Sequence, residues 1–469
     1  MKGIQTAFGW MLLGSVLALP GCDNGGGIVA GIDRGGVTGG AVGTITGFGS
    51  VIVNDVHYDT ARADIVVNGN PATEAELEVG YVVVVNADIP ADGSAPSATS
   101  IQFSHDVIGP IASVDVALDQ MVVIGQTIRL DGATTFGAGI QPASVDGLVA
   151  LPATQVVRVS GLRGDDGSLL ATRVELGSAG ADLEVTGLVS MVDAGANTLR
   201  IGALTVDYSG ANLEGFGSGE PAVGDRVKAE GQQVGAGGAL TATSLERKEI
   251  ELSLDDGVEL ELEGLITSFT STASFSVSGI PVVTNAQTEY ENGSAVMLGP
   301  DVRVEVEGRV DTNGTLVADE VEFRQVGEAR VEAAVESVDA AGGTLVVLGI
   351  TVRTDASTSF EDKSPAELRP FSLSDLIPGD EVRIRGSEDP GGILATRIQR
   401  SEPLEELVLR GTATNVADPQ FEILGVTVLT DAQTDLESDF FTTADGRLVH
   451  VEGDTTTGSF LAEKAEIKD

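Results

Sequence analysis

Aromatic and basic side chains are scarce in this sequence. Aromatic residues make up 4% of the 469 residues, and 27 Lys and Arg stand against 71 Asp and Glu, which gives a formal net charge of −44. Because such a surface repels phosphates, nucleic acid is not an expected partner. The acidity is typical of a well-solvated surface, and cation capture is the alternative interpretation.

Cysteine and long apolar runs are also nearly absent. Cys22 is the single cysteine, so no internal disulfide can form. Lys2 and the short apolar run over residues 10–19 predict a secretory signal peptide at residues 1–21, because the run is too short for a stable membrane helix. The segment Leu19-Pro20-Gly21-Cys22 is similar to the lipobox of bacterial lipoproteins, which implies acylation of Cys22.

No later apolar stretch approaches the roughly 18 residues that a membrane helix needs, so lipid on Cys22 is the only expected membrane anchor. The expected location is therefore the bacterial cell envelope, on the periplasmic face or the cell surface, with the inner and outer membranes both left open. Residues 22–40 contain many glycines and few bulky side chains, which predicts a flexible tether.

The rest of the chain repeats itself. Each copy carries a hairpin of alternating apolar residues around a turn, as in Leu345-Val346-Val347-Leu348-Gly349-Ile350-Thr351-Val352, and the first copy has Asn54-Asp55 at that turn. A strand that closes in Gly follows, and then a strand that begins Ala-x-x-apolar. These alanines recur at intervals of 73, 71, 76, 77 and 67 residues, which indicates six copies. They are Ala98, Ala171, Ala242, Ala318, Ala395 and Ala462.

The chain contains 61 glycines, which suits short strands joined by tight turns. Each copy has five predicted strands, and Thr73-Glu74-Ala75-Glu76 and Ser364-Pro365-Ala366-Glu367 carry helix-start chemistry before the fourth. This order is that of an OB-type barrel, so we predict an all-β chain of six tandem five-stranded OB-like barrels, with tandem β-sandwich modules as the alternative. The predicted repeats 1 to 6 span residues 41–105, 106–179, 180–250, 257–326, 329–401 and 404–469.

The opening Gly47-Phe48-Gly49-Ser50-Val51-Ile52-Val53-Asn54, the glycine-rich tether and the repeated hairpins together resemble a bacterial lipoprotein family with a repeated domain of unknown function 5666. The resemblance covers nearly the whole mature chain. It implies tandem β domains in the cell envelope, and it brings no catalytic or ligand-binding residue with it.

Residues with catalytic or metal-binding chemistry form no recognisable pattern. His57, His105 and His450 are the only histidines, and none stands at a metal-ligand spacing from another, so we expect them on strand surfaces. The sequence also lacks the Gly-x-Ser-x-Gly motif of a nucleophilic serine and a glycine-rich phosphate-binding loop with lysine. We therefore predict no catalytic, cofactor-binding or metal-binding residues.

Three acidic turns could offer oxygens to calcium: Asp165-Asp166-Gly167, Asp255-Asp256-Gly257 and Asp311-Thr312-Asn313-Gly314. None matches the twelve-residue calcium loop, and Asp or Asn beside Gly is what tight turns require, so turns are the favoured interpretation. Arg163-Gly164-Asp165 spells an adhesion tripeptide, which we interpret as a chance match in a hairpin loop.

These observations favour a non-enzymatic array of modules that binds an extracytoplasmic ligand or partner, with a saccharide or a protein as the expected class. Few aromatic residues are present to stack on a ligand, among them Tyr58, Tyr81, Tyr208 and Tyr290. A structural spacer without a ligand pocket is the alternative. An enzyme with a site hidden in one repeat is the least favoured hypothesis.

Overall fold

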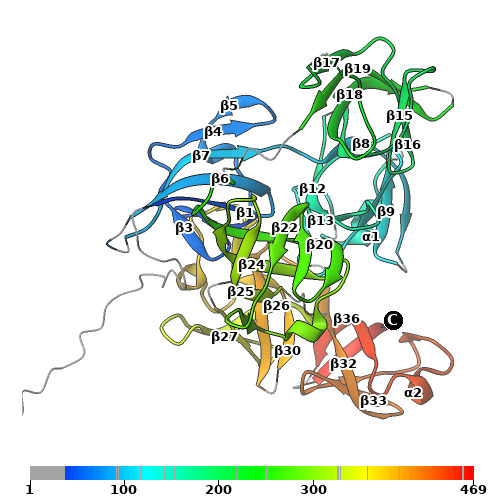
Figure 1. Cartoon of the computed structure of the whole chain (residues 1–469). Helices are drawn as coiled ribbons and strands as arrows, with labels where there is room; N and C mark the ends of the chain where they lie inside the picture. Colours follow the sequence, from blue (N-terminus) through cyan, green and yellow to red (C-terminus); the bar gives the residue numbers. More distant parts are fainter. Residues whose placement is uncertain are drawn as a thin grey trace, which may run out of the picture.

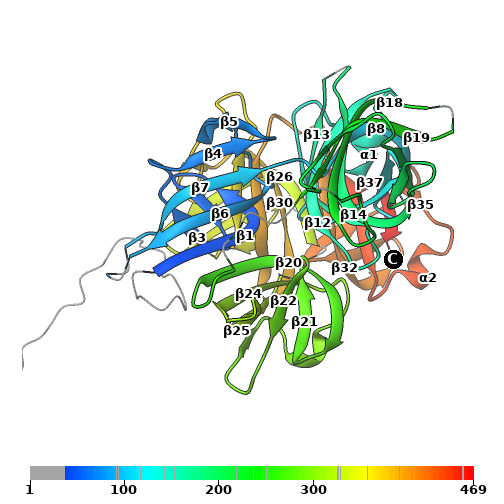
Figure 2. The same ribbon diagram turned by 45° about the horizontal axis from the view of Figure 1, so that its top comes forward.

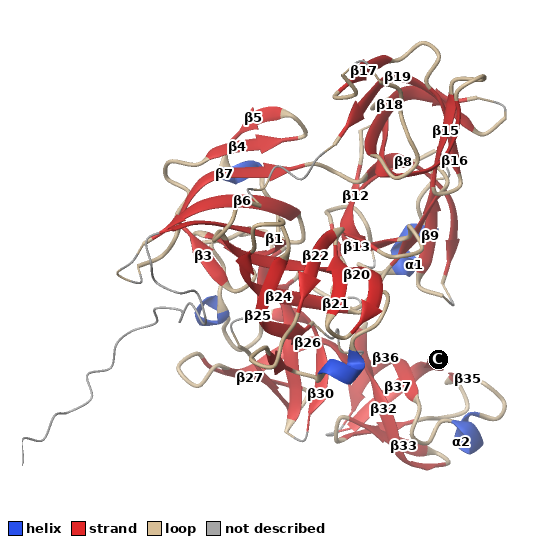
Figure 3. Cartoon of the chain, in the orientation of Figure 1, coloured by secondary structure: helices blue, strands red, loops and turns tan. Residues whose placement is uncertain are grey.

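The computed structural model describes residues 37–468 except 91, 93, 117, 142, 153, 179, 218, 236, 249–251, 253, 325–326, 328, 356, 390, 405 and 457–458. The predicted signal peptide and Cys22 therefore lie outside the described residues. The described part is built almost entirely of strands joined by turns, with a few single-turn helices (Figure 3).

Six groups of strands follow one another along the chain. Repeat 1 contains β1 (Val37–Gly47), β2 (Val51–Val53), β3 (Val56–Tyr58), β4 (Asp64–Val67), β5 (Asn70–Ala72), η1 (Glu74–Glu76), β6 (Val82–Ile89) and β7 (Ser97–Phe103). Repeat 2 contains β8 (Val107–Asp115), β9 (Gln120–Val123), β10 (Gln126–Arg129), β11 (Thr135–Phe136), α1 (Val145–Val149), β12 (Val156–Arg163) and β13 (Leu169–Leu176). Repeat 3 contains β14 (Leu183–Asp193), β15 (Thr198–Ile201), β16 (Leu204–Asp207), β17 (Asn212–Glu214), β18 (Arg226–Val234) and β19 (Ala239–Arg247).

The second half of the chain has the same composition of elements. Repeat 4 contains β20 (Glu259–Ser271), β21 (Ser274–Val277), β22 (Ile280–Val283), β23 (Glu289–Glu291), η2 (Ala295–Met297), β24 (Arg303–Val310) and β25 (Leu316–Phe323). Repeat 5 contains β26 (Ala329–Asp339), β27 (Thr344–Val347), β28 (Ile350–Arg353), β29 (Ser359–Asp362), η3 (Leu373–Asp375), β30 (Glu381–Asp389) and β31 (Gly392–Arg400). Repeat 6 contains β32 (Leu407–Ala417), β33 (Gln420–Ile423), β34 (Val426–Leu429), β35 (Asp435–Leu436), α2 (Phe440–Thr443), β36 (Leu448–Thr456) and β37 (Ser459–Lys468).

The strand pairing confirms the predicted barrel. In repeat 5, β26 pairs with β27, β27 with β28, β28 with β31, β31 with β30, and β30 again with β26. Only the β28–β31 pair is parallel, and this closed order is that of the OB fold. Repeats 2, 3, 4 and 6 have the same ring of pairs, while in repeat 1 a single bridge between Asp59 and Ser97 joins the third strand to the fifth.

A β-bulge explains why the fourth strand of a repeat contains glycine. The register of β30 and β31 shifts between Arg385 and Gly386, where Gly386 lies opposite Ala395. A Cβ on Gly386 would come within 2.1 Å of the carbonyl oxygen of Leu394, so only glycine fits without a shift of the backbone. The same bulge recurs at Gly161, Gly231, Gly308 and Gly453, and at Ala87 in repeat 1.

Gly386→Val is therefore expected to destabilise the protein by about 2–4 kcal/mol, because two strands must separate to admit the side chain. Gly210→Val is the matched control, since a Cβ at Gly210 would have no neighbour within 4 Å. The measurement is thermal unfolding followed by circular dichroism. Equal decreases in the unfolding temperature of the two variants would contradict the role given to the bulge.

The two predicted helix starts have different outcomes. Thr73 forms a capping box with Glu76 at the start of η1, which confirms the first. The second is wrong: Ser364-Pro365-Ala366-Glu367 forms a turn in which the amide of Glu367 donates to the carbonyl of Ser364. The short helix of repeat 5 begins eight residues later, with a capping box between Ser372 and Asp375. The carboxylate of Asp362 holds the earlier turn by accepting from the amides of Ser364 and Leu368.

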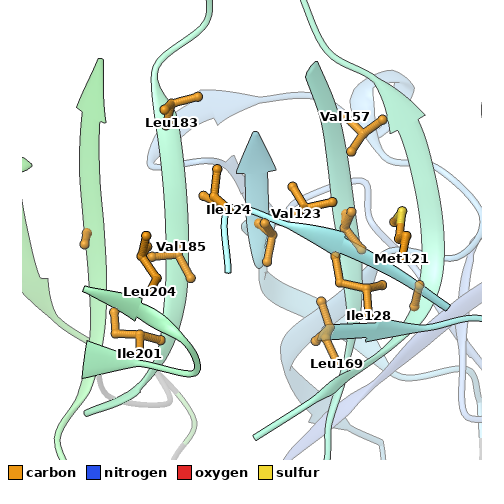
Figure 4. Close-up of a cluster of buried hydrophobic side chains, with 14 of the residues drawn as sticks. Met121, Val123, Ile124, Ile128, Val157, Leu169, Leu183, Val185, Ile201 and Leu204 are labelled. Carbon is orange, nitrogen blue, oxygen red and sulfur yellow. The ribbon is translucent and has the colours of Figure 1, made fainter. Parts of the chain in front are cut away.

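Apolar residues that alternate along the strands fill each barrel. In repeats 2 and 3 two interiors join into one buried cluster, with Ile124 between them (Figure 4). The junction is continuous because β8 pairs with β14, and the carbonyl of Gly125 accepts from the amide of Ala203 at 3.0 Å.

The barrels assemble in pairs that do not follow chain order throughout. Strand β1 pairs in parallel with β20, which joins repeat 1 to repeat 4, whereas β8–β14 joins repeats 2 and 3, and β26–β32 joins repeats 5 and 6. Figures 1 and 2 show the resulting cluster, in which the blue first repeat lies beside the green fourth repeat. None of the helices in the described part of the chain is long and apolar enough to cross a membrane.

Strand β1 begins at Val37, so the last residues of the predicted tether, 37–40, lie in a strand that pairs with β6 and, from Gly39 onward, also with β20. A Cβ on Gly40 would come within 2.9 Å of the carbonyl oxygen of Val85, and one on Gly39 within 3.1 Å of that of Glu259. These glycines therefore allow close packing of β1 between β6 and β20.

Candidate functional site

Repeats 1, 2, 4 and 5 line a partly open cavity of about 380 Å³, which we name the central cavity. Its wall consists of the end of β1 and the β2–β3 turn of repeat 1, parts of β11 and β13, the ends of β20, β24 and β25, and parts of β29, β30 and β31. Labels from all four repeats meet around the middle of Figure 1. The charged residues in the wall are Asp55, Glu263, Glu305, Glu322, Asp355, Glu388 and Asp389, with Arg303 and Arg324.

Arg324 is the centre of the charged wall. Its Nη2 lies 2.8 Å from the Asp55 carboxylate of repeat 1 and 3.1 Å from Glu322, and it also donates to Glu305. Burial and the nearby Asp55 raise the pKa of Glu305 to about 8, although Arg324 opposes this. One guanidinium thus faces three carboxyl groups, and the raised pKa of Glu305 favours its protonated form at neutral pH.

A second ion pair secures the same wall. Arg303 donates through Nε and Nη2 to Oε1 of Glu263, at 2.9 and 2.6 Å, and the amide of Thr44 donates to the other oxygen of Glu263 at 2.7 Å. Burial alone would raise the pKa of Glu263, but Arg303 and Arg324 outweigh it and hold the pKa below its ordinary value. Glu263 is therefore a charged contact between repeats 4 and 1.

Further carboxylates are buried along the same junction. Glu261 lies 4% exposed on β20, and burial together with Glu305 and Glu307 raises its pKa well above the ordinary value. Burial and the neighbouring Glu320 and Glu305 raise the pKa of Glu307 to about 8. The outer face of repeat 4 is therefore an acidic surface that repeat 1 covers, and it folds with protons bound.

A second cavity, of about 370 Å³, lies where repeats 1, 2 and 5 meet. Here the charges pair with one another: Arg173 lies 2.9 Å from Glu175, 3.4 Å from Glu78 of repeat 1 and 3.5 Å from Glu361 of repeat 5. Arg397 lies 2.5 Å from Glu361. These contacts join three barrels, and we interpret this network as structural.

Phe48 of the Gly47-Phe48-Gly49-Ser50 opening belongs to the same junction. The guanidinium of Arg369 in repeat 5 lies 3.5 Å from the centre of the Phe48 ring, a cation–π contact, and donates to the carbonyl of Glu74 at 2.8 Å. The opening that the sequence marks most clearly is thus a contact between the first and fifth barrels.

The three histidines lie in separate places, and the described residues contain no cluster of acidic or histidine side chains with metal-binding geometry. His57 is exposed on β3 and lies 3.0 Å from the hydroxyl of Ser50, and His450 lies on β36, 3.2 Å from Glu452. The strand-surface prediction is wrong for His105. This ring is 2% exposed between β7 and β8, where it contacts Phe103 and lies 3.6 Å from Glu175.

The acidic segments form turns. The Asp311 carboxylate accepts from the amides of Asn313 and Thr315, which fixes the turn between β24 and β25. Arg163 of the adhesion-like tripeptide does not project from its hairpin, because its guanidinium donates to the carbonyl of Thr186 and so joins repeats 2 and 3. The backbone amide of Asp165 donates to the carboxylate of Asp301 in repeat 4 at 2.8 Å.

The aromatic residues expected to stack on a ligand are mostly in barrel interiors or junctions. Tyr58, Tyr81 and Tyr208 are 2%, 4% and 5% exposed. The residues that do line the central cavity, Asp55 and Arg324 above all, were not singled out from the sequence. The Asn-Asp turn in the first copy was the available signal, since it replaces a glycine-containing turn with a carboxylate that contacts repeat 4.

Comparisons with known proteins place five of the six barrels in one family. The family model described as a domain of unknown function, DUF5666, matches residues 108–175, 186–246, 263–322, 332–399 and 410–466. Repeat 1 lies outside these matches and shares their strand order. No curated protein matches the chain. Because the five matches cover more than half of the sequence, the chain belongs to the DUF5666 family.

Proposed function

We propose that this chain is a lipid-anchored protein of the bacterial cell envelope that binds a small extracytoplasmic ligand in the central cavity and catalyses no reaction. The observation that carries the proposal is the cavity itself. Its volume of about 380 Å³ is in the range of small-molecule sites, and its wall combines apolar residues such as Ala133 and Leu394 with charged ones. The proposed anchor is Cys22, on the basis of the lipobox-like sequence.

The order in which the barrels pair supports binding over the spacer hypothesis. A spacer gains length by placing its barrels one after another, whereas here repeat 1 returns to pair with repeat 4 and contacts repeat 5 through Phe48. Arg324–Asp55 and Arg173–Glu361 are ion pairs between distant repeats that a linear array would not need. These contacts shorten the molecule and close the cavity wall.

The test is thermal unfolding of the chain from Asp23 onward in the presence of oligosaccharides, peptidoglycan fragments, organic amines and dicarboxylates, each with calcium and with a chelator. A compound that binds only the folded state raises the transition temperature by mass action. We expect at least one class to do so, and we expect Ser387→Trp, which adds an indole to the cavity wall, to abolish the shift. Ser190→Trp, on the exposed face of β14 in repeat 3, is the control.

Three results would contradict the proposal. A panel in which no class raises the transition temperature would leave the cavity without a ligand and would favour the spacer. A shift of equal size in the native chain and in Ser387→Trp would place the ligand elsewhere on the protein. A shift with calcium alone would assign the binding to a metal site.

A further inference from the structure

The wall of the central cavity has an excess of negative charge. Among the described residues, seven carboxylates and two guanidinium groups line it, and Arg353 pairs with Asp389 from outside the wall, so the formal charge is four negative charges before any proton binds. This excess disfavours phosphates and carboxylates inside the cavity, since an anion would be brought close to like charges in a partly buried space.

The excess is concentrated beside Arg324. Asp55, Glu305 and Glu322 all contact this one guanidinium, and the amide of Asn292 donates to Glu322 at 2.9 Å. This part of the wall therefore has more hydrogen-bond acceptors than donors. A ligand with N–H groups would supply the missing donors.

The remaining wall suits short alkyl groups better than sugar rings. Leu394 and Ala133 are the apolar residues of the wall that are not fully buried, and Phe323 is the only aromatic residue among the described residues of the wall. Phe323 is 2% exposed and packs within the repeat 4 interior, so it offers little face for stacking. Saccharide sites usually depend on an exposed aromatic face, which this cavity does not have among its described residues.

We propose that the central cavity binds a small organic cation, an alkylamine with one or two ammonium groups, whose N–H groups contact Asp55, Glu305 and Glu322. This assignment rests on the proposed function and names the ligand class for the same site. The amine replaces the proton that Glu305 holds in the empty protein, so that binding releases one proton to solvent.

The groups around Glu305 determine whether amine binding strengthens or weakens as the pH rises. Arg324 favours the carboxylate form of Glu305, whereas burial and the acidic groups nearby favour the protonated form, with a pKa of about 8. The titratable or charged groups that act on Glu305, or on which it acts, are Arg324, Asp55, Glu263, Glu261, Glu307 and Tyr58, and Glu322 shares Arg324 with it. Below pH 8 an amine must displace the proton, so its dissociation constant is expected to fall about tenfold between pH 6 and pH 7 and about fivefold between pH 7 and pH 8.

The experiment is isothermal titration calorimetry of the chain from Asp23 onward with putrescine, spermidine and succinate. Putrescine and succinate both have four carbons and differ in the sign of their charge. We expect putrescine or spermidine to bind and succinate not to bind. The heat at pH 7 should differ between two buffers of different ionisation enthalpy by the amount that corresponds to about one released proton.

Glu305→Gln provides the decisive variant. Gln resembles the protonated form that Glu305 already has at pH 7, so the variant is expected to fold, but it cannot pair with an ammonium as a carboxylate does. We expect at least about tenfold weaker amine binding and no proton release. Glu220→Gln, an exposed acid of repeat 3, removes the same charge and should bind as the native chain does.

Each other outcome overturns the assignment in its own way. Succinate binding without amine binding would mean that the ligand is anionic, although the cavity still binds ligands. Binding of another class alone in the thermal panel would overturn the amine and leave the proposed function intact, whereas a panel with no shift would overturn both. Equal amine binding in Glu305→Gln and Glu220→Gln would show non-specific attraction to an acidic protein.

Discussion

Arg324→Met is expected to destabilise the junction of repeats 1 and 4 by about 3–5 kcal/mol, because it leaves Asp55, Glu305 and Glu322 without their common cation. Methionine keeps most of the length of the side chain and removes only the guanidinium. Protonation of Glu305 partly relieves the repulsion at pH 6, so the loss should be larger at pH 8.5. Hydrogen exchange of the paired amides in β1 and β20 measures the free energy of opening at this junction.

Arg247→Met is the matched control for this variant. Arg247 in repeat 3 is 43% exposed and has a carboxylate partner, Asp225, at 2.9 Å. Water screens this pair on the Arg247 side, although Asp225 is 9% exposed, so its loss should cost less than that of Arg324 and should not change exchange in β1 or β20. If Arg324→Met lowered the free energy of opening in β1 and β20 no more than Arg247→Met does, the charged wall of the cavity would not hold repeats 1 and 4 together.

Raising the pH from 7 to 8.5 is expected to weaken the same junction by about 2–4 kcal/mol. Glu305 and Glu307 have pKa values raised to about 8, and that of Glu261 is also raised, chiefly by burial. In this window the folded state holds protons that the unfolded state has already released, so stability falls as the pH rises. His105 and His450, whose pKa values are lowered chiefly by burial, change stability only below this window.

The triple variant Glu261→Gln, Glu305→Gln and Glu307→Gln tests the assignment. Glutamine does not titrate. The free energy of opening that hydrogen exchange in β1 and β20 measures should therefore be nearly independent of pH between 7 and 8.5. The variant should also be more stable than the native chain at pH 8.5. Constant or increasing stability of the native chain over this range would contradict the account of the buried acids.

The barrel could be predicted because its signals are local in the sequence. Period-two apolar residues define the strands, and the glycine of the fourth strand marks a bulge where Gly386 lies against the backbone of β31. One local signal was missed. In repeat 5 the hydroxyl of Thr358 donates to the carbonyl of Ala395 at 2.7 Å, and Asp355 holds that turn. Thr134, Thr288 and Thr434 make the same contact in their own repeats.

The cavity could not be predicted, because its residues come from strands that face outward from their own barrels. Glu305 and Glu322 alternate with buried apolar residues, and that pattern is typical of a solvent-exposed strand face. Arg163 and His105 show the same effect, since both looked like surface residues and both contact a neighbouring barrel. Which outward face meets another barrel depends on contacts such as β1–β20, between residues more than 200 positions apart.

Small-angle X-ray scattering of the chain from Asp23 onward tests most directly whether the barrels gather around a central cavity. A compact chain of this length is expected to have a radius of gyration of about 22 Å, and a somewhat larger value would still fit a cluster of barrels. Six barrels in a row would give roughly 50 Å. A value below about 30 Å at pH 6.5 is the predicted result. A value near 50 Å would mean that the cavity wall does not assemble in solution, and it would contradict both the binding site and its proposed ligand.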